Sequence, residues 1–167
     1  GCGLLNRDAW FEQTLESATE GLHDRLRAPR TPADLHHQPH LFLNAVWVET
    51  GERVIASDLV IDAQWFPGAH DLVSMVGDAV SLSTASATSA RFPFTNAIGS
   101  LHGAPATCHL NPLPTGPHDT TSVCGHLADG GYYDNSGGFT TTDVIRAVQR
   151  VIMEEEAREC GREGTTT

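Results

Sequence analysis

The sequence of 167 residues contains no lysine, and all ten of its basic residues are arginine. Aspartate and glutamate together number 21, so the formal net charge is −11. An acidic chain with scattered arginines offers no basic patch to a polyanion, which argues against nucleic acid as a partner. The same composition lacks the lysine- and arginine-rich cluster that binds anionic lipid headgroups.

Long apolar runs are also missing. No stretch of 18 apolar residues occurs, so we expect no transmembrane segment in this chain. The four cysteines form no C-x-x-C pair, which argues against a zinc knuckle or a redox motif, and we expect no metal and no cofactor. Cys108 and Cys124 could close a disulfide loop or remain two unpaired thiols. Hydrophobic residues still make up 40% of the chain, which is enough for a globular core.

Hydrophobic periodicity predicts an α/β chain. We expect helices over residues 8–27, over 71–90 as one broken or two short helices, and over 141–158. Strands are expected over 41–48 and 53–57, joined as a hairpin by a turn that contains a glycine. Residues 96–126 are rich in proline and glycine and are expected to be a long loop. The last helix should face the core through Val144, Val148, Val151 and Ile152.

An acidic residue followed by two glycines stands out in the second half of the chain. A short apolar run, Leu127-Ala128, leads into Asp129-Gly130-Gly131. Two glycines permit positive φ and a sharp bend immediately after the carboxylate. This pattern predicts that Asp129 stands at the end of a strand, where α/β proteins place their sites. Taken alone, an Asp-Gly-Gly sequence is most often only a turn.

The residues around this motif occur in a distinctive order. Leu82-Ser83-Thr84-Ala85 and then residues 89–94 precede residues 129–137, which read Asp-Gly-Gly-Tyr-Tyr-Asp-Asn-Ser-Gly. Upstream are the segments Leu43-Asn44-Ala45 and Glu49-Thr50-Gly51. Over roughly residues 40–150, the chain resembles the second half of patatin-like phospholipase domains.

The resemblance implies a fold and a chemistry. The expected fold class is α/β, specifically the C-terminal part of a three-layer α/β/α patatin-like fold with a mixed, mainly parallel sheet. The implied function is hydrolysis of a lipid acyl ester by a serine–aspartate dyad, with Asp129 as the base and with Gly130 and Gly131 shaping its turn. The implied partner is a lipid ester substrate, with peripheral contact to a membrane also possible. Asn135 is expected to anchor the following loop through its side chain.

The chain departs from the family in two respects. No serine stands in a G-x-S-x-G sequence; Ser136 comes nearest, with Gly138 after it but Asp134 before it. No glycine-rich oxyanion loop precedes the first expected helix. We therefore expect that residues 1–160 are the C-terminal part of such a domain, that 161–167 form a frayed tail, and that the nucleophile lies upstream. This chain alone should then be inactive, and it should expose a sheet edge and an apolar face.

Other residues admit more than one interpretation. His36, His37 and His40 could bind a metal or could be solvated loop residues. Arg91 could bind a lipid phosphate or form a structural salt bridge. Trp65 and Phe66 could contact lipid or could pack a loop onto the core. For the whole chain, the alternatives to the hydrolase are a patatin-like module that binds a lipid or a partner without catalysis, and a globular domain in which Asp-Gly-Gly is only a turn.

Overall fold

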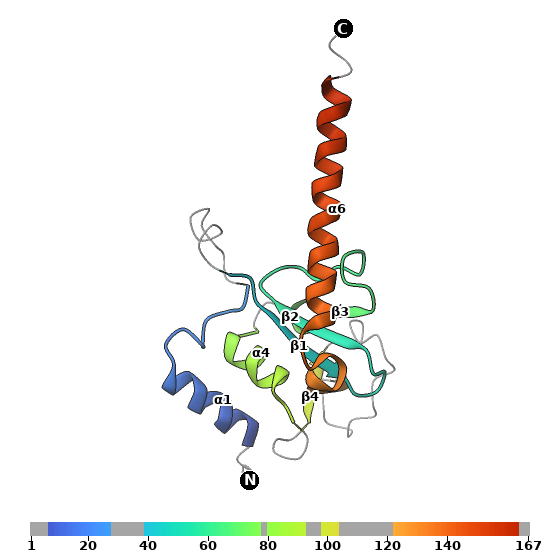
Figure 1. Cartoon of the computed structure of the whole chain (residues 1–167). Coiled ribbons are helices and arrows are strands. Elements are labelled where there is room, and N and C mark those ends of the chain that lie inside the picture. The colour runs from blue at the N-terminus through green and yellow to red at the C-terminus, as the bar shows by residue number, and fades with distance from the viewer. Residues whose placement is uncertain (1–6, 28–38, 78–79, 93–97, 104–121, 164–167) are drawn as a thin grey trace.

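The computed structural model describes residues 7–27, 39–77, 80–92, 98–103 and 122–163. These residues form an α/β fold with one five-stranded mixed sheet and several helices (Figure 1). In chain order the elements are α1 (Arg7–Ala18), β1 (Phe42–Trp47), β2 (Arg53–Ser57), β3 (Ala69–Asp71), α3 (Leu72–Val76), α4 (Leu82–Ser89), β4 (Gly99–Gly103), β5 (Ser122–Asp129), α5 (Gly131–Asp134) and α6 (Gly138–Glu163). No helix among the described residues has the length and apolar character needed to cross a membrane.

The sheet has the strand order β3-β2-β1-β5-β4. The predicted hairpin is confirmed, because β1 and β2 pair antiparallel with Asn44 opposite Ile55. The expectation of a mainly parallel sheet is wrong for the described strands: only β2 and β3 pair in parallel, and the other three pairs are antiparallel. The short turn after β1 permits only a hairpin, whereas a parallel partner needs a longer crossover.

The predicted long loop over residues 96–126 contains strands that the sequence did not reveal. Residues 99–103 form β4, and β5 begins at Ser122. Both ends of β4 are glycine, which weakens any local strand signal, so this strand depends on its partner β5. The middle of the predicted loop, including Cys108, lies outside the described residues.

The predicted helices are found with different lengths, and the short helix α5 was not predicted. The expected helix over 8–27 ends at Ala18, and Gly21 then adopts a φ of +88° that a helix cannot continue. Residues 71–90 form two short helices, with Asp71 capping α3 and Ser81 capping α4 through their side chains. The last helix runs from Gly138 to Glu163 and is therefore longer than predicted.

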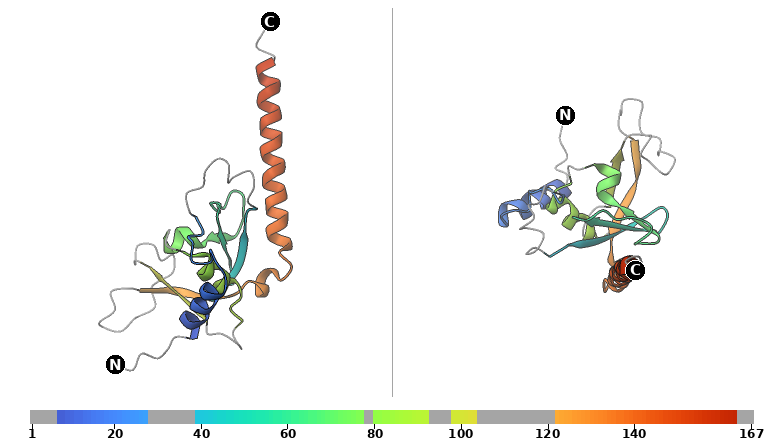
Figure 2. Two further views of the ribbon diagram at one scale, coloured as in Figure 1. Left: turned by 90° about the vertical axis from the view of Figure 1, so that its left-hand side faces the viewer. Right: turned by 90° about the horizontal axis from the view of Figure 1, so that it is seen from above.

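Helices cover both faces of the sheet, because alternate side chains of strand β2 belong to two different core clusters. Val54 and Ala56 belong to the core cluster that includes residues of α3 and α4, whereas Ile55 belongs to a second cluster against which Val144 of α6 packs. Successive side chains of a strand point to opposite faces, so α4 and α6 lie on opposite sides. Figure 2 shows this arrangement, with the sheet between α4 and α6.

Most of α6 extends beyond the sheet, as Figure 1 shows. Val144 packs as predicted, but Val148, Val151 and Ile152 are each more than half exposed, so the predicted inner face is wrong for these three. Only the first turns of the helix reach the described part of the core. This exposed apolar surface lies on α6 and is not the apolar sheet face that we expected from missing strands. It lines a groove of about 430 Å³ together with Trp65 and neighbouring apolar side chains.

The Trp65–Phe66 pair supports the interpretation as a packed loop. Phe66 is buried in the second core cluster, and Trp65 packs against that cluster. The guanidinium of Arg150 also lies over the ring of Trp65, with its Cζ atom 5.2 Å from the ring centroid.

Candidate functional site

Asp129 is the last residue of β5, as the sequence predicted. Its backbone N–H donates to the carbonyl of Arg91 at 2.9 Å, and the N–H of Gly130 donates to the carbonyl of Ser89 at 3.2 Å. Across the sheet, Asp129 is paired with Ala45 of β1. The end of β5 is thus held between β1 and the residues at the C-terminal end of α4, which fixes the position of the Asp129 backbone.

Only one oxygen of the Asp129 carboxylate accepts a hydrogen bond from the described residues. Its Oδ1 accepts a hydrogen bond from the N–H of Gly131 at 2.7 Å, which closes a local turn. Oδ2 makes no hydrogen bond within the described part of the chain, and the residue is partly exposed. One oxygen therefore orients the side chain, while the other is available to accept a proton or a hydrogen bond.

Close packing favours the two glycines, most strongly Gly130, for a reason that the sequence did not indicate. Neither Gly130 nor Gly131 has a positive φ, and Gly130 has helical angles of −64° and −21°. What excludes a side chain is space: a Cβ on Gly130 would lie 2.2 Å from the backbone oxygen of Asn44. A Cβ on Gly131 would lie 2.9 Å from Asp129 Oδ1. The expectation of a sharp bend through positive φ is therefore wrong, and close packing replaces it.

We expect Gly130→Ala to destabilise the protein by about 1–3 kcal/mol, because the new methyl group must push the β1 backbone away from β5. The matched control is Gly138→Ala, where the nearest atom is the Ser136 hydroxyl at 3.1 Å, at the end of a short side chain. Urea unfolding monitored by circular dichroism would compare the two variants. Equal losses would show that the contact with Asn44 can relax without cost.

The loop after the glycines is anchored by Asp134, which the sequence analysis had not singled out. Asp134 is buried, and its Oδ2 accepts a hydrogen bond from the N–H of Thr140 at 3.1 Å. The predicted anchor, Asn135, makes no side-chain hydrogen bond within the described residues; its Oδ1 lies 3.0 Å from the point a Cβ on Gly131 would occupy. Ser136 accepts a hydrogen bond from the N–H of Gly138 at 3.3 Å, which is a structural role at the start of α6.

A buried polar network joins this loop to the sheet. The Thr140 hydroxyl donates to Asn44 Oδ1 at 2.8 Å and accepts from Arg53 Nη1 at 3.0 Å. Arg53 also forms an ion pair with Asp143 at 2.5 Å, and both side chains are almost fully buried. Asn44 thus contacts Gly130 through its backbone and α6 through its side chain. Arg53 in β2 offered no sequence signal, because its partner lies 90 positions away along the chain.

No protein-family model, curated protein or solved structure matches this chain.

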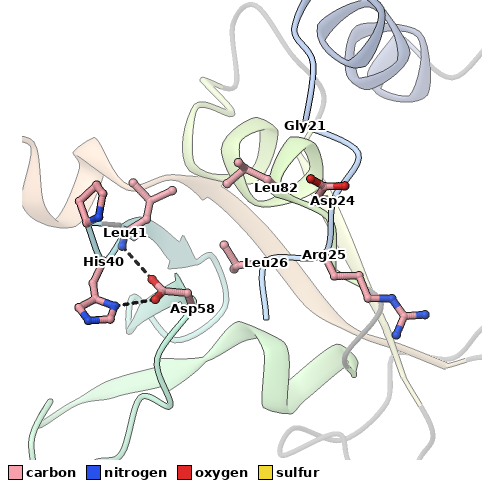
Figure 3. A pocket seen from close by; sticks show the side chains of 9 residues that line it. Gly21, Asp24, Arg25, Leu26, His40, Leu41, Asp58 and Leu82 are labelled. Carbon is pink, nitrogen blue, oxygen red and sulfur yellow. Dashed lines mark hydrogen bonds and ion pairs between the residues drawn. The ribbon is translucent and has the colours of Figure 1, made fainter. Parts of the chain in front are cut away.

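A second polar pair lies beside a cavity of about 310 Å³ (Figure 3). His40 Nδ1 lies 2.7 Å from Asp58 Oδ2, and Asp58 Oδ1 accepts the N–H of Leu41 at 2.8 Å. The guanidinium of Arg25 points away from this pair in Figure 3. The cavity is lined by Gly21, Asp24, Arg25, Leu26, Pro39, His40, Leu41, Asp58 and Leu82. None of these side chains is a hydroxyl or thiol nucleophile, so the pair orders the start of β1 and provides no obvious catalytic centre.

The structure offers no support for a phosphate site at Arg91 or for a metal site among the described residues. Arg91 is buried and its Nη2 lies 3.4 Å from Glu12 Oε1, which supports the salt bridge and not the phosphate site. His36 and His37 lie outside the described residues. Within the described ranges, no three histidine, cysteine, aspartate or glutamate residues come together in a possible metal site.

Two histidine–glutamate pairs hold the hairpin turn between β1 and β2: Glu49 pairs with His126 of β5, and Glu52 pairs with His70 of β3. Partial burial acts to raise the pKa of Glu49, but hydrogen bonds from the backbone and side chain of His126 outweigh it and lower that pKa overall. The hydrogen bond with His70 lowers the pKa of Glu52. Both carboxylates are therefore held in the ionised state, which suits ion pairing and not general-base catalysis near neutral pH.

Proposed function

We propose that this chain supplies the aspartate of a serine–aspartate dyad in a lipid acyl-ester hydrolase, as the C-terminal part of a patatin-like three-layer domain. One observation carries the proposal: Asp129 ends a strand with its backbone fixed, one carboxylate oxygen is oriented by Gly131, and the other makes no hydrogen bond to the described residues. This is the arrangement that a general base needs before its partner hydroxyl is in place. The order of motifs around Asp129 adds the likeness to the patatin-like family.

The proposed chemistry needs one further side chain. A serine hydroxyl from residues outside this sequence would give its proton to Asp129 Oδ2 as its oxygen attacks the ester carbonyl. The alcohol leaves with that proton, and an acyl-enzyme remains. Asp129 then takes a proton from the water that attacks the acyl-enzyme and returns it to the serine oxygen as the fatty acid is released. No step needs a histidine, a metal or a cofactor.

A second candidate function is a patatin-like module that binds a lipid or a partner without catalysis. The observation in its favour is the apolar stripe Val148, Val151 and Ile152 on α6, which exposes more apolar surface than a helix in water normally retains. This alternative shares the scaffold but requires no nucleophile.

The experiment that separates the two uses the complete protein of which this chain would be the C-terminal part. We expect it to release fatty acid from phosphatidylcholine or lysophosphatidylcholine and to be labelled on one serine by a fluorophosphonate probe, whereas residues 1–167 alone should do neither. Peptide mapping of the labelled protein would identify the serine. A complete protein that folds, binds lipid vesicles and resists the probe would favour the non-catalytic module.

A further inference from the structure

Two aromatic rings form a pair on the residues that directly follow two hydrogen-bond partners of Asp129. Phe92 follows Arg91, whose carbonyl accepts the N–H of Asp129, and Tyr132 follows Gly131, whose N–H binds the Asp129 carboxylate. The two rings are stacked, with centroids 5.8 Å apart and planes 7° from parallel. The residue after each of these two hydrogen-bond partners of Asp129 thus contributes one ring to the stacked pair.

Both rings of this pair are partly exposed to solvent. Phe92 is 44% exposed and Tyr132 is 54% exposed, although the pair is attached to the well-fixed end of β5. Flat aromatic faces bind aliphatic chains by dispersion and by release of water, and they offer nothing to a short polar acyl group. The Tyr132 hydroxyl can stay in water while its ring is covered, as is usual where one end of a contact is apolar and the other is wet.

We propose that the stacked Phe92–Tyr132 pair is the surface on which the aliphatic acyl chain of the ester lies, and that it sets a preference for long over short acyl chains. The inference rests on the proposed function, because it takes the reacting carbonyl to lie near Asp129 Oδ2. It adds a specificity-determining surface to that function. The groove between Trp65 and α6 supports no comparable inference, since nothing in the structure indicates what covers it.

The test measures kcat/KM of the complete protein on p-nitrophenyl esters from butanoate to decanoate. Complete burial of a methylene is worth about fourfold, so a one-sided aromatic surface should give on the order of twofold per methylene. Over this series the wild-type preference for decanoate would reach on the order of 60-fold. In the Phe92→Ala/Tyr132→Ala double variant, the loss should grow with chain length, so that this preference falls to a few-fold.

Two further variants keep the result interpretable. Tyr132→Phe retains the ring and should retain the chain-length dependence. Phe139→Ala is the matched control, because Phe139 is 62% exposed and pairs with another ring, Tyr133 at 5.7 Å, but belongs to α6. It should leave the dependence unchanged.

The outcomes separate this inference from the proposed function. A double variant that loses the same factor on every ester, or a Phe139→Ala variant that loses the chain-length preference equally, would overturn the acyl-chain surface and leave the hydrolase in place. A complete protein that hydrolyses no ester would overturn both.

Discussion

Asp129→Asn should reduce ester hydrolysis by the complete protein by on the order of 10⁴-fold while leaving the fold intact. Asparagine keeps the Oδ1 atom that accepts the N–H of Gly131 at 2.7 Å, so the local turn should persist. Asparagine lacks the second carboxylate oxygen: an NH₂ group stands in its place, which donates hydrogen bonds and cannot accept a proton. The substitution therefore separates the base from the turn.

The matched control for this substitution is Asp62→Asn. Asp62 is exposed and makes the same local contact, with its Oδ1 accepting the N–H of Gln64 at 2.7 Å. Both variants remove one charge from the same kind of turn, so non-specific effects of charge and local geometry should be equal. Activity would be measured as the fatty acid released per molecule of folded protein, with circular dichroism as the check on folding. Comparable activities for the two variants would refute the role of Asp129 as a base.

Fluorophosphonate labelling adds a second measurement of the same role. If Asp129 activates a serine, the rate at which the probe labels that serine should fall along with turnover in Asp129→Asn and stay at the wild-type value in Asp62→Asn. A serine that reacts at the wild-type rate in Asp129→Asn would be activated by another group. The dyad would then be wrong even if the protein is a hydrolase.

The parts of the fold that could be predicted are those coded by local patterns. The hairpin of β1 and β2 followed from two apolar segments around a turn that contains Gly51, and the two short helices followed from hydrophobic periodicity. The place of Asp129 at a strand end followed from the apolar residues before it. Each of these features depends on neighbours within a few positions, which a single sequence displays directly.

The parts that could not be predicted depend on contacts between distant segments. Strand β4 carries glycine at both ends and forms because β5 supplies its partner. The need for glycine at position 130 comes from the backbone of Asn44, and the burial of Arg53 comes from Asp143. The outward face of α6 was mispredicted because a helical stripe indicates which side is apolar but not whether anything covers it.

Arg53→Ala should destabilise the protein by about 3–5 kcal/mol. Removing the guanidinium leaves the Asp143 carboxylate buried without its main partner and removes a hydrogen bond to Thr140. Arg146→Ala is the matched control: its Nη1 lies 4.0 Å from the same carboxylate, but its side chain is 73% exposed, so we expect a loss below about 0.5 kcal/mol. Urea unfolding would measure both. Equal losses would show that the carboxylate is solvated and that the buried pair contributes little.

A double variant shows what the pair does for the site. Arg53→Met combined with Asp143→Leu replaces the charges with apolar groups and should recover most of the stability that Arg53→Ala loses. It cannot restore the hydrogen bond through which Arg53 holds the Thr140 hydroxyl toward Asn44. Asn44 is the residue whose backbone oxygen packs against Gly130. If the network positions Asp129, the double variant should remain stable yet hydrolyse esters several-fold more slowly, whereas full activity would limit Arg53 to a role in stability.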